Sequence, residues 1–242
     1  MSSGVAYAEA PSERAPESLT PAQRLKTAVK RAVGLSGRKR VQVLAGPARG
    51  VTMTINFAGE TPLYLGMFEW ELHRFYREAL HGARLVFDIG GYVGYDALMF
   101  AANSPGRVIT FEPNAAQAAL LAENVAQNPG LAPRIEVSPL AIAGADGEGA
   151  TTLDSLAARV GVPDFVKLDI DGGEAEALRG GLETLASNRP HLVVETHSLA
   201  LERECGALLV ECGYRPIIKH NRRVWREHRA GAAHNRWLLA AP

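Results

Sequence analysis

Short apolar runs alternate with helix-like stretches over the second two thirds of the chain, and this alternation constrains the fold more than any other feature. The apolar runs lie at 85–87, 108–111, 135–137, 165–168 and 192–194, and the helical patterns at about 94–103, 114–127, 152–160, 173–187 and 198–212. Strands that are buried on both faces and separated by helices form βαβ units, so the pattern predicts a mostly parallel sheet covered by helices. Two further strands, at 215–219 and 237–240, are joined by a connection too short for a crossover helix, which predicts an antiparallel final pair.

The chain divides into three parts on this basis. Residues 1–22 are rich in Ala, Ser, Pro and Glu and are expected to be disordered. Residues 23–83 are expected to form an N-terminal extension that caps the site, with a small hairpin within 41–57 and an amphipathic helix over 68–80. Residues 84–242 then form the α/β domain.

Composition limits the partners of the protein. Lys plus Arg and Asp plus Glu are equal at 26 each in 242 residues, so no global field directs the chain toward nucleic acid. No apolar run approaches the roughly 20 residues of a membrane helix, and the N-terminus lacks the features of a secretory signal. We therefore expect a cytoplasmic protein. Cys205 and Cys212 are seven residues apart in one predicted helix, too far for a disulfide, and are expected to be free thiols.

A basic stretch over 24–40 is the one local exception to the neutral balance. It could make a weak peripheral contact with anionic lipid or with a polyanionic substrate, and a solvated helix is the alternative interpretation. The sequence gives no prediction of the oligomeric state.

The first apolar run leads into a turn with the sequence Asp88-Ile89-Gly90-Gly91-Tyr92-Val93-Gly94. Glycine lets the backbone turn tightly and approach a ligand with no Cβ in the way. The dinucleotide fingerprint Gly-x-Gly-x-x-Gly fails here in both registers, because Ile89, Tyr92 and Tyr95 stand where glycine is required. A carboxylate at the head of the turn would repel a pyrophosphate but suits a ligand with an ammonium and a sulfonium. S-Adenosylmethionine is therefore the expected ligand, and a plain strand–helix turn is the alternative. The residues expected to line it are Asp88, Gly90, Gly91, Tyr92 and Gly94.

Acidic residues and a histidine follow three other predicted strands. Glu112 comes directly after the run 108–111, where a carboxylate can accept both ribose hydroxyls. Asp169 follows the run 165–168 and could orient an acceptor hydroxyl or contact the amino group of the ligand. Glu195 and His197 follow the run 192–194, and an imidazole near neutrality is the usual general base. We expect His197 to be the base, with Asp169 or Glu195 orienting it, although a structural histidine is the alternative.

A divalent metal is a second way to lower the pKa of a hydroxyl. Asp169, Asp171 and Glu195 would be its ligands. The sequence contains no compact ligand motif, so no metal is expected.

These segments together resemble the FkbM family of S-adenosylmethionine-dependent methyltransferases. The resemblance is carried by the stretches 86–94, 108–114, 152–156 and 165–180, and it extends into 189–197. It implies the class I methyltransferase fold, a Rossmann-like seven-stranded sheet with an antiparallel last strand, and O-methylation, often of sugars, glycolipids or secondary metabolites. It also implies that Leu140 and Ala141 lie by the adenine. The family often has alanine in place of Gly91 and usually glutamate in place of Asp171, so a direct role for the shorter Asp171 carboxylate is in doubt.

Two other functions compete with an O-methyltransferase acting on a small-molecule or glycan hydroxyl. One is an NAD-dependent oxidoreductase or epimerase, which the failed fingerprint disfavours. The other is a non-catalytic S-adenosylmethionine-binding interaction module. Upstream, the segment 65–70 contains Glu69 and Trp70, which could frame the acceptor, and a helix packing on the sheet is the alternative.

Overall fold

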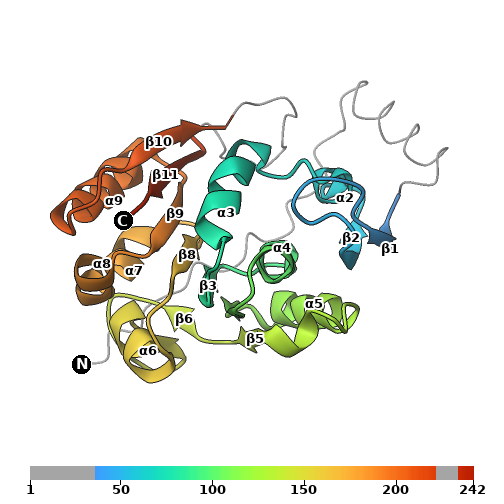
Figure 1. Cartoon of the computed structure of the whole chain (residues 1–242), viewed down its shortest axis with the longest axis horizontal. Helices are drawn as coiled ribbons and strands as arrows, with labels where there is room; N and C mark the ends of the chain where they lie inside the picture. Colours follow the sequence, from blue (N-terminus) through green and yellow to red (C-terminus); the bar gives the residue numbers. More distant parts are fainter. Residues whose placement is uncertain (1–35, 222–233) are drawn as a thin grey trace, which may run out of the picture.

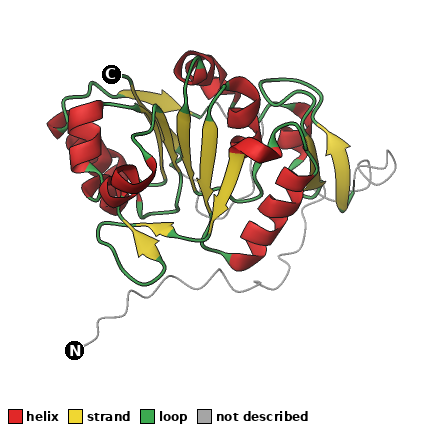
Figure 2. Cartoon of the chain, turned by 60° about the horizontal axis from the view of Figure 1, so that its bottom comes forward, coloured by secondary structure: helices red, strands yellow, loops and turns green. Residues whose placement is uncertain are grey.

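The computed structural model describes residues 36–221 and 234–242, and it has three layers with a seven-stranded sheet in the middle (Figures 1 and 2). The strands in spatial order are β10 (Ile217–His220), β11 (Arg236–Ala240), β9 (His191–Thr196), β8 (Phe165–Leu168), β3 (Leu85–Ile89), β4 (Arg107–Phe111) and β5 (Ile135–Ser138). β11 runs antiparallel to both of its neighbours, and every other neighbouring pair is parallel. The predicted sheet and its antiparallel last strand are therefore confirmed.

Helices cover both faces of this sheet, as the view in Figure 2 shows. One face carries α3 (His73–Leu80), α4 (Tyr95–Asn103) and α5 (Ala115–Ala126), and the other carries α6 (Leu153–Val160), α7 (Glu174–Arg179), α8 (Leu182–Asn188) and α9 (Leu199–Glu211). Alternate residues of each strand serve the two cores. Val86 packs toward α4, whereas Phe87 packs toward the opposite helices. This is why the central strands are apolar runs rather than alternating patterns.

Local hydrogen bonds account for several of the element boundaries. The Asn114 side chain accepts from the amides of Ala116 and Gln117 and so caps α5. Thr152 caps α6, and the Asp154 carboxylate accepts from the first amides of α8. The stretch 152–156, part of the family resemblance, therefore joins two helices.

The N-terminal extension begins with the predicted hairpin, formed by β1 (Arg38–Gln42) and β2 (Thr52–Asn56). Among the described residues, the outer edge of β2 does not meet a third strand. Instead, the side-chain amides of Asn124, on α5, and of Asn128, just after α5, donate to and accept from the backbone of Thr54 and Thr52, respectively. Two asparagines thus satisfy a strand edge that would otherwise be exposed. A short helix, α2 (Thr61–Leu65), and a 3₁₀ turn, η1 (Trp70–Leu72), lead on to α3.

Two expectations about local structure were wrong, and one element was missed. The predicted helix 173–187 is two helices separated by Gly180 and Gly181, which pack against the Ala143 carbonyl and the Leu153 side chain at distances that leave no room for a Cβ. The helix expected over 68–80 becomes α-helical only at His73. A small parallel pair, β6 (Ala141–Ile142) and β7 (Ala150–Thr151), was not anticipated.

Some expectations concern residues outside the described ranges. The disorder expected for 1–22, the basic stretch up to residue 35 and the connection through 230–232 fall outside them. Both cysteines are buried free thiols, as predicted. Within 36–221 and 234–242, no helix combines the length and the apolar character that a membrane span requires.

Candidate functional site

The glycine turn connects the end of β3 to the start of α4. The amides of Gly90 and Gly91 both donate to the Phe111 carbonyl at 3.0 Å, which closes the turn onto the end of β4. Gly90 has φ 98° and Gly94 has φ 87°, a region that glycine adopts without a steric penalty. A Cβ on Gly90 would overlap the Asp169 carbonyl, and one on Gly91 would meet Thr110 and Leu121. The turn, which we call the cradle, is therefore packed closely against the rest of the protein at Gly90 and Gly91.

Glu112 bridges the turn and the following loop. One carboxylate oxygen accepts from the Tyr92 amide at 2.9 Å and the other from the Asn114 amide at 2.8 Å. Burial raises the pKa of Glu112, and these two amides partly oppose that rise. Tyr92 has φ 45°, and its hydroxyl donates to Glu60 at 3.0 Å, at the start of α2. The carboxylate expected to receive the ribose is thus held by the backbone on both sides, beside the turn.

Asp88 lies beneath the turn and has no exposed surface. Its Oδ2 accepts from the Thr110 hydroxyl at 2.8 Å, while its Oδ1 is buried without a hydrogen-bond partner. Burial, reinforced by the nearby Asp96, raises the pKa of Asp88 to about 7. The Asp88 carboxylate is therefore not on the surface of the turn. It could act on a ligand there only through its electrostatic field.

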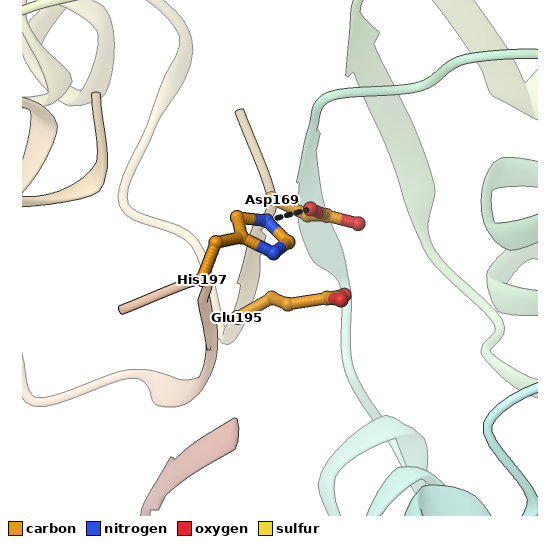
Figure 3. Close-up of side chains that lie close together, drawn as sticks. All are labelled: Asp169, Glu195 and His197. Atoms are coloured by element: carbon orange, nitrogen blue, oxygen red, sulfur yellow. Dashed lines mark ion pairs between the residues drawn. The ribbon is translucent and has the colours of Figure 1, made fainter. Parts of the chain in front are cut away.

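Asp169, Glu195 and His197 converge from the ends of β8 and β9 (Figure 3). His197 Nε2 lies 3.5 Å from Asp169 Oδ1 and 3.4 Å from Asp171 Oδ1. The contact with Asp169 raises the pKa of His197. Burial opposes ionisation of Asp169, but His197 and Lys167 outweigh it and lower the pKa of Asp169 to about 2. The pair is therefore an ionised carboxylate 3.5 Å from a half-buried imidazole, close enough to stabilise the charged form of the imidazole.

Glu195 is the most enclosed member of this group. Its two oxygens accept from the Asn235 amide at 2.7 Å and from the Trp237 indole at 3.2 Å, both supplied by the segment that enters β11. Burial and the charge of Asp169 raise the pKa of Glu195 well above its ordinary value. Its anchoring by two donors suits a supporting role, behind the Asp169–His197 pair.

A buried lysine that the sequence did not single out lies under these groups. Lys167, on β8, has 1% of its surface exposed. Its ammonium lies 2.5 Å from Asp96, 3.2 Å from Glu69 and 3.8 Å from Asp169. Burial disfavours the ammonium, but Asp96 and Glu69 outweigh this effect and hold the pKa of Lys167 well above its ordinary value. The sequence did contain a signal for this network, because Lys167 lies within a strand that is predicted to be buried on both faces. A cation buried there requires acidic partners.

Glu69, a candidate for framing the acceptor, belongs to this buried network. It is 9% exposed, and besides Lys167 it accepts from the Tyr76 hydroxyl at 2.8 Å. Burial raises the pKa of Glu69 to about 7, although Lys167 opposes the rise. Its carboxylate is thus directed into the protein. Trp70, its neighbour, is 43% exposed.

The acid cluster, which we define by its five carboxylates, contains more acids than the ammonium of Lys167 can balance. Its members are Glu69, Asp88, Asp96, Asp169 and Glu195.

Ligand atoms of Asp169, Glu195 and His197 lie within 4.8 Å of one another, a spacing that a metal ion could use. However, both Glu195 oxygens are engaged by protein donors, and the ammonium 3.8 Å from Asp169 would repel a divalent ion.

The fold brings most of the predicted site residues to one edge of the sheet, at the carboxyl ends of β3, β4, β8 and β9. In open α/β sheets this edge is where ligands bind. Leu140 and Ala141 follow β5 at the same edge; Ala141 is buried in β6, and Leu140 is partly buried against the core that includes Ile142 and Leu153.

Comparison with known families agrees with this geometry. A family model described as the methyltransferase FkbM domain matches residues 88–216, more than half of the chain. A search of curated proteins gave no match.

Comparison with solved structures places the fold among methyltransferases. The precorrin-6y C5,15-methyltransferase of Geobacter metallireducens GS-15 is 14% identical over 71% of this chain and 87% of its own, with a TM-score of 0.50. The ribosomal protein L11 methylase of Lactobacillus delbrueckii subsp. bulgaricus is 16% identical over 72% of this chain and 79% of its own, also at 0.50. The methyltransferase FkbM of Methylobacillus flagellatus KT is 17% identical, covering 76% of this chain and 53% of its own, at 0.49.

Proposed function

The chain belongs to the FkbM methyltransferase family, and from this premise we propose that it binds S-adenosylmethionine on the glycine turn and methylates a hydroxyl group of a small molecule, sugar or glycolipid. The observation that carries the proposal is the position of Glu112, whose carboxylate is bound to the backbone of the turn itself, beside a cradle that admits no Cβ at Gly90 or Gly91. The cradle provides close approach, and the carboxylate provides a bidentate acceptor for ribose hydroxyls.

The charge of the site favours the same ligand. Burial keeps part of the acid cluster protonated near neutral pH, whereas the pKa of Asp169 is lowered to about 2 and its carboxylate stays ionised. S-Adenosylmethionine carries an ammonium and a sulfonium, which this charge would attract, whereas NAD carries a pyrophosphate that Asp169 and Glu112 would repel. This argument weighs against the oxidoreductase alternative.

The residues expected to hold the cofactor are drawn from three strand ends. The methionine part would contact the backbone of Gly90, Gly91, Tyr92 and Gly94, with the Asp88 carboxylate beneath the turn. Glu112 would bind the ribose. The adenine would lie by Leu140 and Ala141. When bound, the cofactor supplies an electrophilic methyl group.

The chain's own task is then to place and deprotonate the acceptor. His197 would take the proton from the acceptor hydroxyl, and Asp169 would hold the imidazole and stabilise its charged form. The ionised Asp169 and the raised pKa of His197 support this assignment. Glu195 would hold the local structure from behind.

Methyl transfer from deuterium-labelled S-adenosylmethionine to a metabolite extract tests the proposal. The full chain should yield products that carry a CD₃ group on oxygen, detected by mass spectrometry. A matched reaction with the H197A variant should give those products far more slowly. Labelled products bearing the methyl group on nitrogen or carbon would contradict the O-methylation part alone.

A further inference from the structure

Lys167 is the most enclosed basic residue among the described parts of the sheet. It lies on β8, with Asp88 on one neighbouring strand and Val193 on the other in register. Its face of the sheet is the one covered by α3 and α4. A charged group in this position is unfavourable unless partners surround it.

Its partners come from three separate parts of the chain. Asp96 belongs to the first turn of α4, Glu69 to the N-terminal extension, and Asp169 to the end of β8 itself. The ring of Phe68 adds a cation–π contact, with the ammonium 5.8 Å from its centroid. One ammonium therefore joins the segment over the site to the carboxylate that faces His197.

The backbone of the extension shows that this contact carries strain. Glu69 has φ 44°, in the left-handed region that non-glycine residues enter at a cost. Its side chain is held there by Lys167 and by the Tyr76 hydroxyl. The cap segment, which we define as residues 66–72, is thus kept in an unfavourable conformation by side-chain contacts that converge on Lys167.

We propose that Lys167 is a positioning residue that couples the cap segment to the Asp169–His197 pair, so that the cap and the candidate base are held as one unit. The catalytic role of the Asp169–His197 pair rests on the proposed function, whereas the coupling between the cap segment and this pair does not. Lys167 makes no described contact with the glycine turn or Glu112, but it lies beside Asp88 in register and partly balances the acid cluster, so cofactor affinity is measured separately from the coupling.

The test replaces the ammonium by an uncharged group of similar length, K167M, in the full chain. The matched control is K219M, which removes a lysine from the edge strand β10. Hydrogen exchange of the cap segment, NMR signals of the His197 ring at fixed pH, and calorimetric titration with S-adenosylmethionine are measured for both variants. The E69Q variant is measured in the same way, because it removes one partner and leaves Lys167 in place.

We expect K167M to speed exchange in residues 66–72 by tenfold or more while sheet amides are unchanged. It should also move the His197 ring signals. K219M should change none of these. Unmoved His197 signals, or exchange accelerated equally throughout the sheet, would reduce Lys167 to a structural residue and overturn the proposal.

Two further outcomes are decided by the same experiment. If K167M does not fold, E69Q decides: faster exchange of the cap segment with a shift at His197 supports the coupling, and no change overturns it. If the unmodified chain fails to bind S-adenosylmethionine, the proposed function fails, whereas the exchange and NMR results still judge the coupling.

Discussion

His197 Nε2 lies 3.5 Å from Asp169 Oδ1, at the ends of two neighbouring parallel strands. The two residues are far apart in sequence, and the sheet brings them together because β8 and β9 end at the same edge. We propose that this pair acts on the acceptor and that the glycine turn binds the cofactor.

The first prediction concerns the imidazole. H197A should lower the rate of methyl transfer by about 10²–10⁴-fold, the usual contribution of a general base. The affinity for S-adenosylmethionine should stay within threefold, because the turn is untouched. A rate close to that of the unmodified chain with saturating acceptor would remove His197 from the mechanism.

The second prediction is the pH dependence of the rate. A base must be neutral to accept a proton, so the rate should rise with pH through the pKa of His197. Asp169 raises that pKa from an ordinary value of 6.5, so the rise should be centred above that pH. In D169N the rise should move to lower pH, and a shift in the opposite direction would show that Asp169 does not stabilise the imidazolium.

The third prediction concerns Glu112. E112Q keeps the size of the side chain but loses its charge, and hydrogen bonds to a charged group are worth about 1.5–3 kcal/mol. We expect the affinity for S-adenosylmethionine to fall about tenfold to a hundredfold by calorimetry. E123Q, on the exposed side of α5, is the matched control and should bind like the unmodified chain.

The fourth prediction separates Asn124, on α5, from Asn128, just after it. Asn124 pairs with β2 and also donates to the Val93 carbonyl in the turn at 2.8 Å, whereas Asn128 pairs with β2 and donates to the Asn124 carbonyl. Each alanine variant should lower the free energy of unfolding by about 1–3 kcal/mol, because backbone groups lose their partners. Urea unfolding measures this loss. Only N124A should also weaken S-adenosylmethionine binding; equal binding by the two variants would mean that the turn does not depend on Asn124.

The fifth prediction tests the cradle. G90A places a Cβ against the Asp169 carbonyl and should abolish detectable binding of S-adenosylmethionine. G82A is the matched control, since Gly82 has φ 78° with open space around it, and should cost only the backbone strain of about 1–2 kcal/mol. Tight binding by G90A would contradict the close approach assigned to the turn.

The sheet was predictable from sequence because its strands are short apolar runs and its helices begin and end at recognisable signals. Asn114, which caps α5, is one such signal. The break at Gly180 and Gly181 was missed, although two adjacent glycines disfavour a helix interior. Helical periodicity continues across the break and hides it.

The candidate site was predictable to the extent that its residues follow strands. Glu112, Asp169 and His197 were found in this way, since strand ends converge in any parallel sheet. The network around Lys167 was not, because Glu69 comes from the extension and periodicity gives no information on which segment covers the sheet. The full burial of Asp88 was also missed, since its place two residues before Gly90 suggested direct contact with a ligand, whereas it lies within β3.

The most direct test of the central claim is calorimetric titration of the full chain with S-adenosylmethionine, S-adenosylhomocysteine and NAD. We predict that the chain binds S-adenosylmethionine at one site, that E112Q binds S-adenosylmethionine more weakly, and that NAD shows no measurable binding. Binding of NAD in preference to S-adenosylmethionine, or S-adenosylmethionine binding that is indifferent to Glu112, would contradict it.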